Sequence, residues 1–151
     1  MCFFICLAVH KKHLQGRNAF PPVFEVIDAT DWSIGEATCG NRDRDRSFLV
    51  IAGGCSCFIS DANRRSEQLL LSELESLIQS LLQQAPSVSI LIHYASGDIR
   101  RERVIKKDKR SIMFNELSGQ FHRLELDVRY VINNESSSLT CNGPGSITVV
   151  S

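Results

Sequence analysis

The chain has 151 residues, a length typical of one domain with a sizeable hydrophobic core. Its 17 basic and 17 acidic side chains cancel, and 43% hydrophobic and 23% charged residues are typical of an ordinary globular protein. These values argue against a global electrostatic attraction to nucleic acid or to an anionic membrane, although they leave a local charged patch open.

The apolar stretch at residues 2–9 is considered first as a targeting segment. A secretory signal carries basic residues before its apolar run, whereas Lys11 and Lys12 follow this one. No stretch reaches the length of about 20 apolar residues that crosses a bilayer. We therefore expect a cytoplasmic protein without a membrane partner, whose cysteines are free thiols, metal ligands or catalytic groups rather than disulfides.

The first half of the chain predicts three strands. Residues 3–9 are apolar at successive positions, which is typical of a central strand covered on both faces. Residues 23–28 indicate a second strand, and 35–46 lack apolar periodicity and indicate an exposed loop. The apolar run 47–52 predicts a third strand, which leads directly into a glycine pair at 53–54.

The longest helix is expected at residues 62–84, with Asp61 as its N-cap, because leucine and isoleucine recur there at spacings of three and four. Pro86 ends it, and residues 87–94 predict a further strand. A strand, a long helix and a strand in that order usually return parallel to one another through a right-handed crossover.

The last third predicts a short strand at 103–106, a short helix at 114–119 and a strand at 121–132, where apolar and polar residues alternate. Residues 133–151 are rich in Asn, Ser and Gly and indicate a loop and tail that can add a short edge strand. The fold class expected for residues 1–132 is a single α/β or α+β domain, with a mixed sheet covered by one long helix.

Four of the six cysteines form two groups, and these indicate a metal site. Residues two or four apart in a strand share a face, so Cys2 and Cys6 point the same way, and Cys55 and Cys57 can converge if extended. Together they offer the four sulfurs of a tetrahedral zinc site. Zinc is therefore the expected cofactor, although only the first pair, with three intervening residues, has the usual two to four, and the second pair has one.

Other ligand sets and a purely structural interpretation stay open. Three sulfurs together with His10, His13 or His93 would also complete a site. Conversely, free cysteine is among the most buried residue types, so Cys6 could simply fill space in a buried strand. This interpretation is weaker for the pair after the glycines, because loops at strand ends often present functional groups in open sheets.

Cys2 is also a candidate nucleophile. Removal of Met1 would place its thiol beside a free α-amino group that can act as the general base. Class II glutamine amidotransferases resemble this chain in opening with Met-Cys, but their following glycine is replaced here by Phe3, and the chain is short for their four-layer architecture. A cysteine-dependent hydrolase or amidotransferase-like enzyme that uses Cys2 or Cys55 is therefore an alternative function.

The opening Met-Cys-Phe-Phe with Leu-Ala-Val at 7–9, combined with Gly-Gly-Cys-Ser-Cys at 53–57, resembles a group of small bacterial proteins of unknown function. The resemblance implies no activity, but it raises the expectation that the two cysteine segments belong to one site. Cys39 and Cys141 lie outside both segments and are not included.

A basic segment is the third candidate, as part of an interaction module. Its seven positive charges are enough for a phosphate-contacting surface, but it has no aromatic residue that could stack on a base. This favours a solvated hairpin over a nucleic-acid site. The basic residues are Arg100, Arg101, Arg103, Lys106, Lys107, Lys109 and Arg110.

His93 ends an apolar strand, which favours a core histidine with satisfied hydrogen bonds over a catalytic base. Asp98, just beyond it, is the residue that could orient the ring. The glycine pair lacks the spacing and the lysine of a phosphate-binding loop, and no Gly-x-Ser-x-Gly motif is present. Nucleotide binding and serine hydrolase chemistry therefore have no support.

Overall fold

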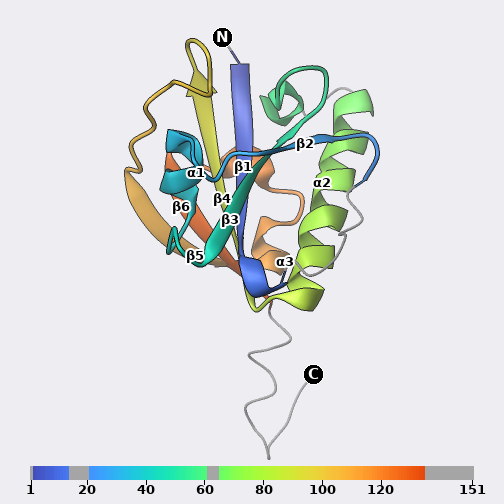
Figure 1. The fold of residues 1–151 in the computed structure, drawn as a ribbon. Helices are drawn as coiled ribbons and strands as arrows, with labels where there is room; N and C mark the ends of the chain where they lie inside the picture. Colours follow the sequence, from blue (N-terminus) through green and yellow to red (C-terminus); the bar gives the residue numbers. More distant parts are fainter. Residues whose placement is uncertain (1, 14–20, 61–64, 135–151) are drawn as a thin grey trace, which may run out of the picture.

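The computed structural model describes residues 2–13, 21–60 and 65–134, and within them it shows one mixed six-stranded sheet in the order β2-β3-β1-β4-β6-β5 (Figure 1). The strands are β1 (Cys2–His10), β2 (Glu25–Asp28), β3 (Asp45–Ile51), β4 (Ser87–Ala95), β5 (Asp108–Met113) and β6 (Val128–Asn133). The helices are α1 (Ser33–Thr38), α2 (Arg65–Gln84) and α3 (Phe114–Leu117), with short 3₁₀ helices η1 (Lys11–His13), η2 (Cys57–Ser60) and η3 (Phe121–Arg123). The predicted fold, an α+β domain with one long helix, is confirmed.

Strand β1 lies at the centre of the sheet. It is antiparallel to β3, with Ile5 opposite Val50, and antiparallel to β4, with Ile5 opposite Ile92. Strands β3 and β4 therefore run in the same direction, as expected for strands joined by a long helix, but β1 lies between them. The two ends of the sheet differ, because β2 is antiparallel to β3 whereas β5 is parallel to β6.

Side chains alternate between two apolar layers, as the two-residue period of a strand requires. Along β1, Ile5 and Leu7 belong to the larger core, which also contains the buried residues of α2. Phe4 and Cys6 belong to a second cluster, which contains Ile34 of α1. Figure 1 shows α2 and α1 on opposite sides of the sheet, so that the sheet is the middle one of three layers.

Helix α2 packs one face against the sheet, and the predicted apolar stripe is the buried one. Truncating one of these side chains to alanine typically costs about 2–5 kcal/mol. The predicted N-cap Asp61 lies outside the described residues. The buried residues of α2 are Leu74, Leu77, Ile78, Leu81 and Leu82.

The predicted loop at 35–46 is wrong in its first part, because α1 occupies Ser33–Thr38. This helix is too short for a periodic apolar pattern. Its packing is nevertheless close: Ile34 is fully buried, and a Cβ on Gly35 would lie 1.8 Å from the carbonyl oxygen of Ala29. Glycine is therefore required where α1 approaches the preceding segment.

The basic segment does not form the predicted strand at 103–106 or a hairpin. Its chain is irregular up to Lys107, and β5 then begins at Asp108 and pairs in parallel with β6. The predicted strand at 121–132 is likewise shorter, because η3 precedes it and Asp127, with a φ of +61°, changes the chain direction just before β6.

Within the described part of the chain, no helix combines the length and apolar character that crossing a membrane requires. The predicted loop and tail at 133–151 lie almost entirely outside the described residues, since the described chain ends at residue 134.

Candidate metal centre

A tight turn after β3 positions the Cys-x-Cys segment. Gly53 and Gly54 have φ values of +71° and +91°, and the Ala52 amide donates a hydrogen bond to the Cys55 carbonyl over 2.8 Å. Positive φ at both central residues is typical of the two-residue hairpin turn that matches strand twist. The glycine pair therefore folds the chain back, so that Cys55 lies opposite Ala52.

Ser56 holds this segment against β1. Its backbone amide donates to the Phe3 carbonyl over 2.8 Å, and its hydroxyl accepts from the Ile5 amide over 2.9 Å. The same hydroxyl donates to the Val50 carbonyl over 2.5 Å. Because Ile5 and Val50 are opposite one another in β1 and β3, the fully buried Ser56 hydroxyl bridges the two strands.

The cysteines on either side of Ser56 meet the cysteine at the start of β1. The sulfurs of Cys2, Cys55 and Cys57 all lie within 4.8 Å of one another, and all three residues are half-buried. The Cys55 thiol donates a hydrogen bond to the Cys57 sulfur over 2.6 Å. The prediction that the first strand lies beside the glycine-preceded cysteine pair is thus correct for three of the four sulfurs.

The environments of Cys55 and Cys57 differ electrostatically. Desolvation and the hydrogen bond with Cys57 raise the pKa of the Cys55 thiol to about 12. Desolvation also acts to raise the pKa of Cys57, but hydrogen bonds from Cys55, the Phe3 backbone and Cys2 outweigh it and leave that pKa below its ordinary value. Of these two thiols, Cys57 therefore ionises before Cys55.

Cys6 does not join this cluster, although it shares the expected face of β1 with Cys2. Four residues of strand separate their α-carbons by about 13 Å, which is too far for both sulfurs to bind one ion. Cys6 is fully buried, and desolvation raises its pKa to about 12 beside Thr38 and Cys39. The structural interpretation of this cysteine fits its surroundings.

The histidines considered as further ligands lie elsewhere. His10 ends β1 at the opposite end from Cys2, and its ring centroid lies 5.8 Å from that of His13. Among the described residues, the three cysteines are the group of three or more His, Cys, Asp and Glu side chains with metal-ligand spacing.

His93 lies between two carboxylates that sequence reasoning missed. Its Nδ1 is 2.6 Å from Asp127 Oδ1, and its Nε2 is 2.5 Å from Glu102 Oε2. Desolvation lowers the pKa of His93, but these two hydrogen bonds raise it more, so the net pKa is raised. The predicted partner Asp98 instead pairs with Arg100, and only knowledge of the sheet register could have pointed to Asp127.

Glu102 also fixes the turn after β4. Its Oε1 accepts hydrogen bonds from the amides of Ser96 and Gly97, each over 3.1 Å. The hydrogen bond from His93 is the largest of the effects that lower the Glu102 pKa. The prediction of a core histidine with satisfied hydrogen bonds is therefore correct for His93.

Two arginines of the basic segment are engaged by acids. Arg100 binds Asp98 through two hydrogen bonds of 3.1 and 3.0 Å. Arg110 pairs with Asp108 over 3.1 Å and with Glu125 over 2.6 Å. These pairs reduce the positive charge that two of the seven basic residues offer to a phosphate.

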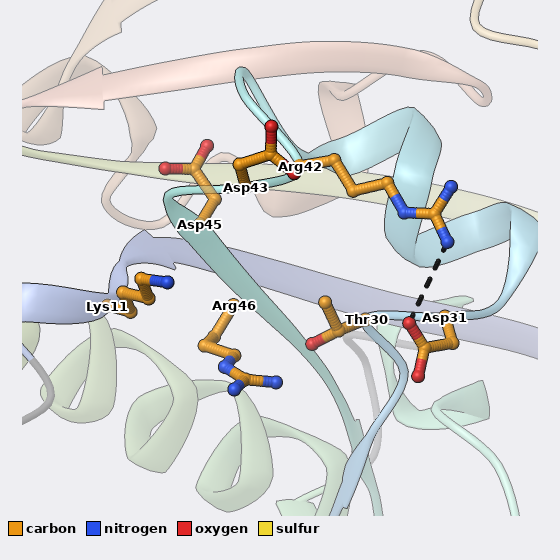
Figure 2. Close-up of a pocket in the computed structure, with 7 residues that line it drawn as sticks. All are labelled: Lys11, Thr30, Asp31, Arg42, Asp43, Asp45 and Arg46. Atoms are coloured by element: carbon orange, nitrogen blue, oxygen red, sulfur yellow. Dashed lines mark ion pairs between the residues drawn. The ribbon is translucent and has the colours of Figure 1, made fainter.

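A polar cavity of about 260 Å³ lies on a different part of the surface, between β3 and the segments before and after α1. Figure 2 shows basic and acidic side chains around it, with Arg42 reaching toward Asp31 at 3.8 Å. Arg42 also contacts Glu36 at 2.6 Å, and Arg46 lies 4.0 Å from Asp28. The mixed signs favour internal pairing over capture of a charged ligand.

Comparison with known proteins finds no relative. No family model matches the sequence, and neither a curated protein nor a solved structure is significantly similar to it. The fold and the thiol cluster are therefore the basis for a functional proposal.

Proposed function

We propose that the protein binds a transition metal ion, zinc, through Cys2, Cys55 and Cys57. The observation that carries this proposal is the convergence of three sulfurs within 4.8 Å from two distant parts of the chain. Tetrahedral zinc holds thiolates at about 2.3 Å, which separates the sulfurs by about 3.8 Å. The Cys55 and Cys57 sulfurs, now 2.6 Å apart, would move apart by roughly 1 Å on binding.

The lowered pKa of the Cys57 thiol favours binding of a cation, because the thiolate is the form that ligates a metal. A divalent ion removes the protons from its thiol ligands, and this includes Cys55, whose pKa is otherwise raised to about 12. Three protein ligands leave the fourth tetrahedral position for an external donor. An open fourth position favours a sensing role for the metal site. The thiols stay available for this role in a reducing compartment such as the cytoplasm.

Covalent catalysis is the weaker candidate. A thiol with a pKa of about 12 is protonated at neutral pH, so Cys55 is a poor nucleophile. Catalysis by Cys2 requires removal of Met1, which lies outside the described residues. The metal site accounts for all three sulfurs with one chemical role.

The test is elemental analysis of protein purified without chelator. We expect about one zinc per chain in the wild type and a loss of most of it in Cys2→Ser, Cys55→Ser and Cys57→Ser, because each serine removes a thiolate ligand. Competition with a chromogenic chelator measures the affinity of each variant for Zn²⁺.

Cys39→Ser is the matched control, because Cys39 is a buried thiol that contacts Ser47 and lies outside the cluster. Cys6→Ala tests the fourth sulfur of the sequence prediction and should retain the metal. Metal content that is low in the wild type, or equal in all the variants, would contradict the proposal.

A further inference from the structure

An apolar cavity of about 350 Å³ opens on the α1 side of the sheet. This volume lies at the lower end of the range for small-molecule sites, which are mostly lined by hydrophobic and aromatic side chains. Strands β1, β2 and β3 and the segments before α1 and after β4 all contribute to it. Its apolar lining consists of Phe4, Ile27, Trp32, Leu49, Ile51 and Ile99.

The cavity adjoins the thiol cluster. Gly54 lines the cavity and directly precedes Cys55, and a Cβ at Gly54 would meet no atom within 4 Å. Cys2 and Cys55 themselves pack against the apolar cluster that contains Phe4, Ile51 and Ile99. A molecule in the cavity therefore contacts the residue that directly precedes Cys55.

The two charged residues that line the cavity form an ion pair with one another. These residues are Asp98 and Arg100, and Arg100 donates to Asp98 from two of its three guanidinium nitrogens, Nε and Nη2. A charged ligand would have to break this pair or lose its hydration without compensation. An uncharged hydrocarbon group loses nothing of this kind and gains from burial.

We propose that the cavity holds the hydrocarbon body of a small apolar thiol, whose sulfur binds the fourth position of the metal ion. This inference rests on the proposed metal site and names its ligand class. The thiol gives its proton to solvent as its sulfur coordinates the ion, and the resulting four-sulfur set is one that zinc commonly adopts.

The experiment uses full-length protein loaded with Co²⁺, whose visible absorption reports the number and kind of ligands. The probes are phenylmethanethiol, phenylmethanol, which lacks the sulfur, and 2-sulfanylethanol, which lacks the apolar ring. Trp32 is the chain's single tryptophan and lines the cavity, so its fluorescence reports occupancy independently of the metal.

Phenylmethanethiol should change both the Co²⁺ absorption and the Trp32 emission, and it should bind about tenfold or more tightly than 2-sulfanylethanol because its ring is buried. Phenylmethanol should change the Trp32 emission alone. Equal affinity for the two thiols, or no response of Trp32 to phenylmethanethiol, would overturn the inference while leaving the metal site intact. Failure to bind Co²⁺ would instead reject the metal site itself, and the inference with it.

Neighbouring residues of β2 provide matched variants. Ile27 lines the cavity, whereas Val26 packs on the α2 side of the sheet. We expect Ile27→Phe to fill the cavity and weaken phenylmethanethiol binding about tenfold, and Val26→Phe to leave it within about twofold. Ile99→Phe fills the cavity from the loop after β4 and is the second test if Ile27→Phe does not fold. Undiminished binding in a folded cavity-filling variant would overturn the inference.

Discussion

The Ser56 hydroxyl makes two hydrogen bonds at a point where strands β1 and β3 face one another. It accepts from Ile5 and donates to Val50, and it is fully buried. Its removal would leave a buried amide and a buried carbonyl without these partners. An unsatisfied buried group of this kind typically costs about 1–3 kcal/mol.

We therefore expect Ser56→Ala to lower the free energy of unfolding by about 2–3 kcal/mol, measured by urea denaturation. It should also weaken Zn²⁺ binding, because Ser56 holds the segment that carries Cys55 and Cys57. Ser76→Ala, at an exposed position of α2, is the control and should have little effect on either quantity. A fully stable Ser56→Ala protein would show that the bridge is dispensable.

His93 provides a prediction of pH dependence. Its pKa is raised in the folded state by Glu102 and Asp127, so its stabilising contribution is complete below the unfolded pKa of about 6.5. That contribution is lost as the pH rises through the higher folded pKa. The Glu102 pKa is lowered, so its contribution is present above about pH 4.3 and is lost in acid.

We expect His93→Gln to remove part of the decline in stability between pH 6 and pH 9, because the raised pKa of His93 contributes to it. Urea unfolding at the two pH values measures this decline. Since the same thiols are present in both proteins, the difference between the wild type and the variant isolates the imidazole. His122→Gln, at an exposed histidine, should follow the wild type. Identical pH profiles of wild type and His93→Gln would refute the assignment.

The sequence allowed part of the site to be predicted at the residue scale. The two-residue period of a strand correctly placed Cys2 and Cys6 on one face, but the rise along the strand excludes Cys6 from a shared ion. Glu102 and Asp127 could not be predicted as partners of His93. Their proximity depends on the pairing of β4 with β6 and on the turn after β4, neither of which leaves a local pattern.

The turn between β3 and the cysteine pair is the element on which the metal site depends. Both Gly53 and Gly54 have positive φ, a region that alanine enters only with strain, whereas asparagine tolerates it. Neither glycine has a neighbour within 4 Å of an added Cβ, so a substitution here tests backbone conformation rather than packing.

We expect Gly53→Ala to destabilise the protein by about 1 kcal/mol and to weaken Zn²⁺ binding, since it disfavours the turn that brings Cys55 to Cys2. Gly53→Asn creates the Asn-Gly pair that this kind of turn prefers and should keep near wild-type affinity. Chelator competition measures both. Equal affinity of the alanine and asparagine variants would argue that the turn conformation does not control the site.

At the scale of elements, the sequence predicted the parts with long apolar patterns. Helix α2 and strands β1, β3 and β4 were all predicted close to their observed positions. Helix α1 was missed because it is only one and a half turns long, and β5 because its first three residues are charged and show no alternation. Short edge elements take their conformation from the partner they join, which a local pattern cannot reveal.

At the scale of the molecule, a metal ion would link the start of β1 to the segment after β3. Because the three ligands converge only in the folded state, binding shifts the folding equilibrium. We expect Zn²⁺ at about 100 times its dissociation constant to raise the free energy of unfolding by about 2.7 kcal/mol, and chelator to reverse this. Urea denaturation with and without Zn²⁺ measures the shift.

Cys55→Ser should lose most of this stabilisation, and Cys39→Ser should keep it. Stabilisation by Zn²⁺ that persists in Cys55→Ser would place the ion elsewhere in the protein.

The central place of β1 has a consequence for how the molecule assembles. Ile5 pairs with Val50 and Ile92, which are synthesised much later in the chain. Pairings between residues so far apart in sequence form slowly during folding. The three sulfurs meet only after this first strand has joined β3, because Ser56 between Cys55 and Cys57 bonds to both strands. The rate of metal uptake during refolding would therefore report the pairing of β1 with β3.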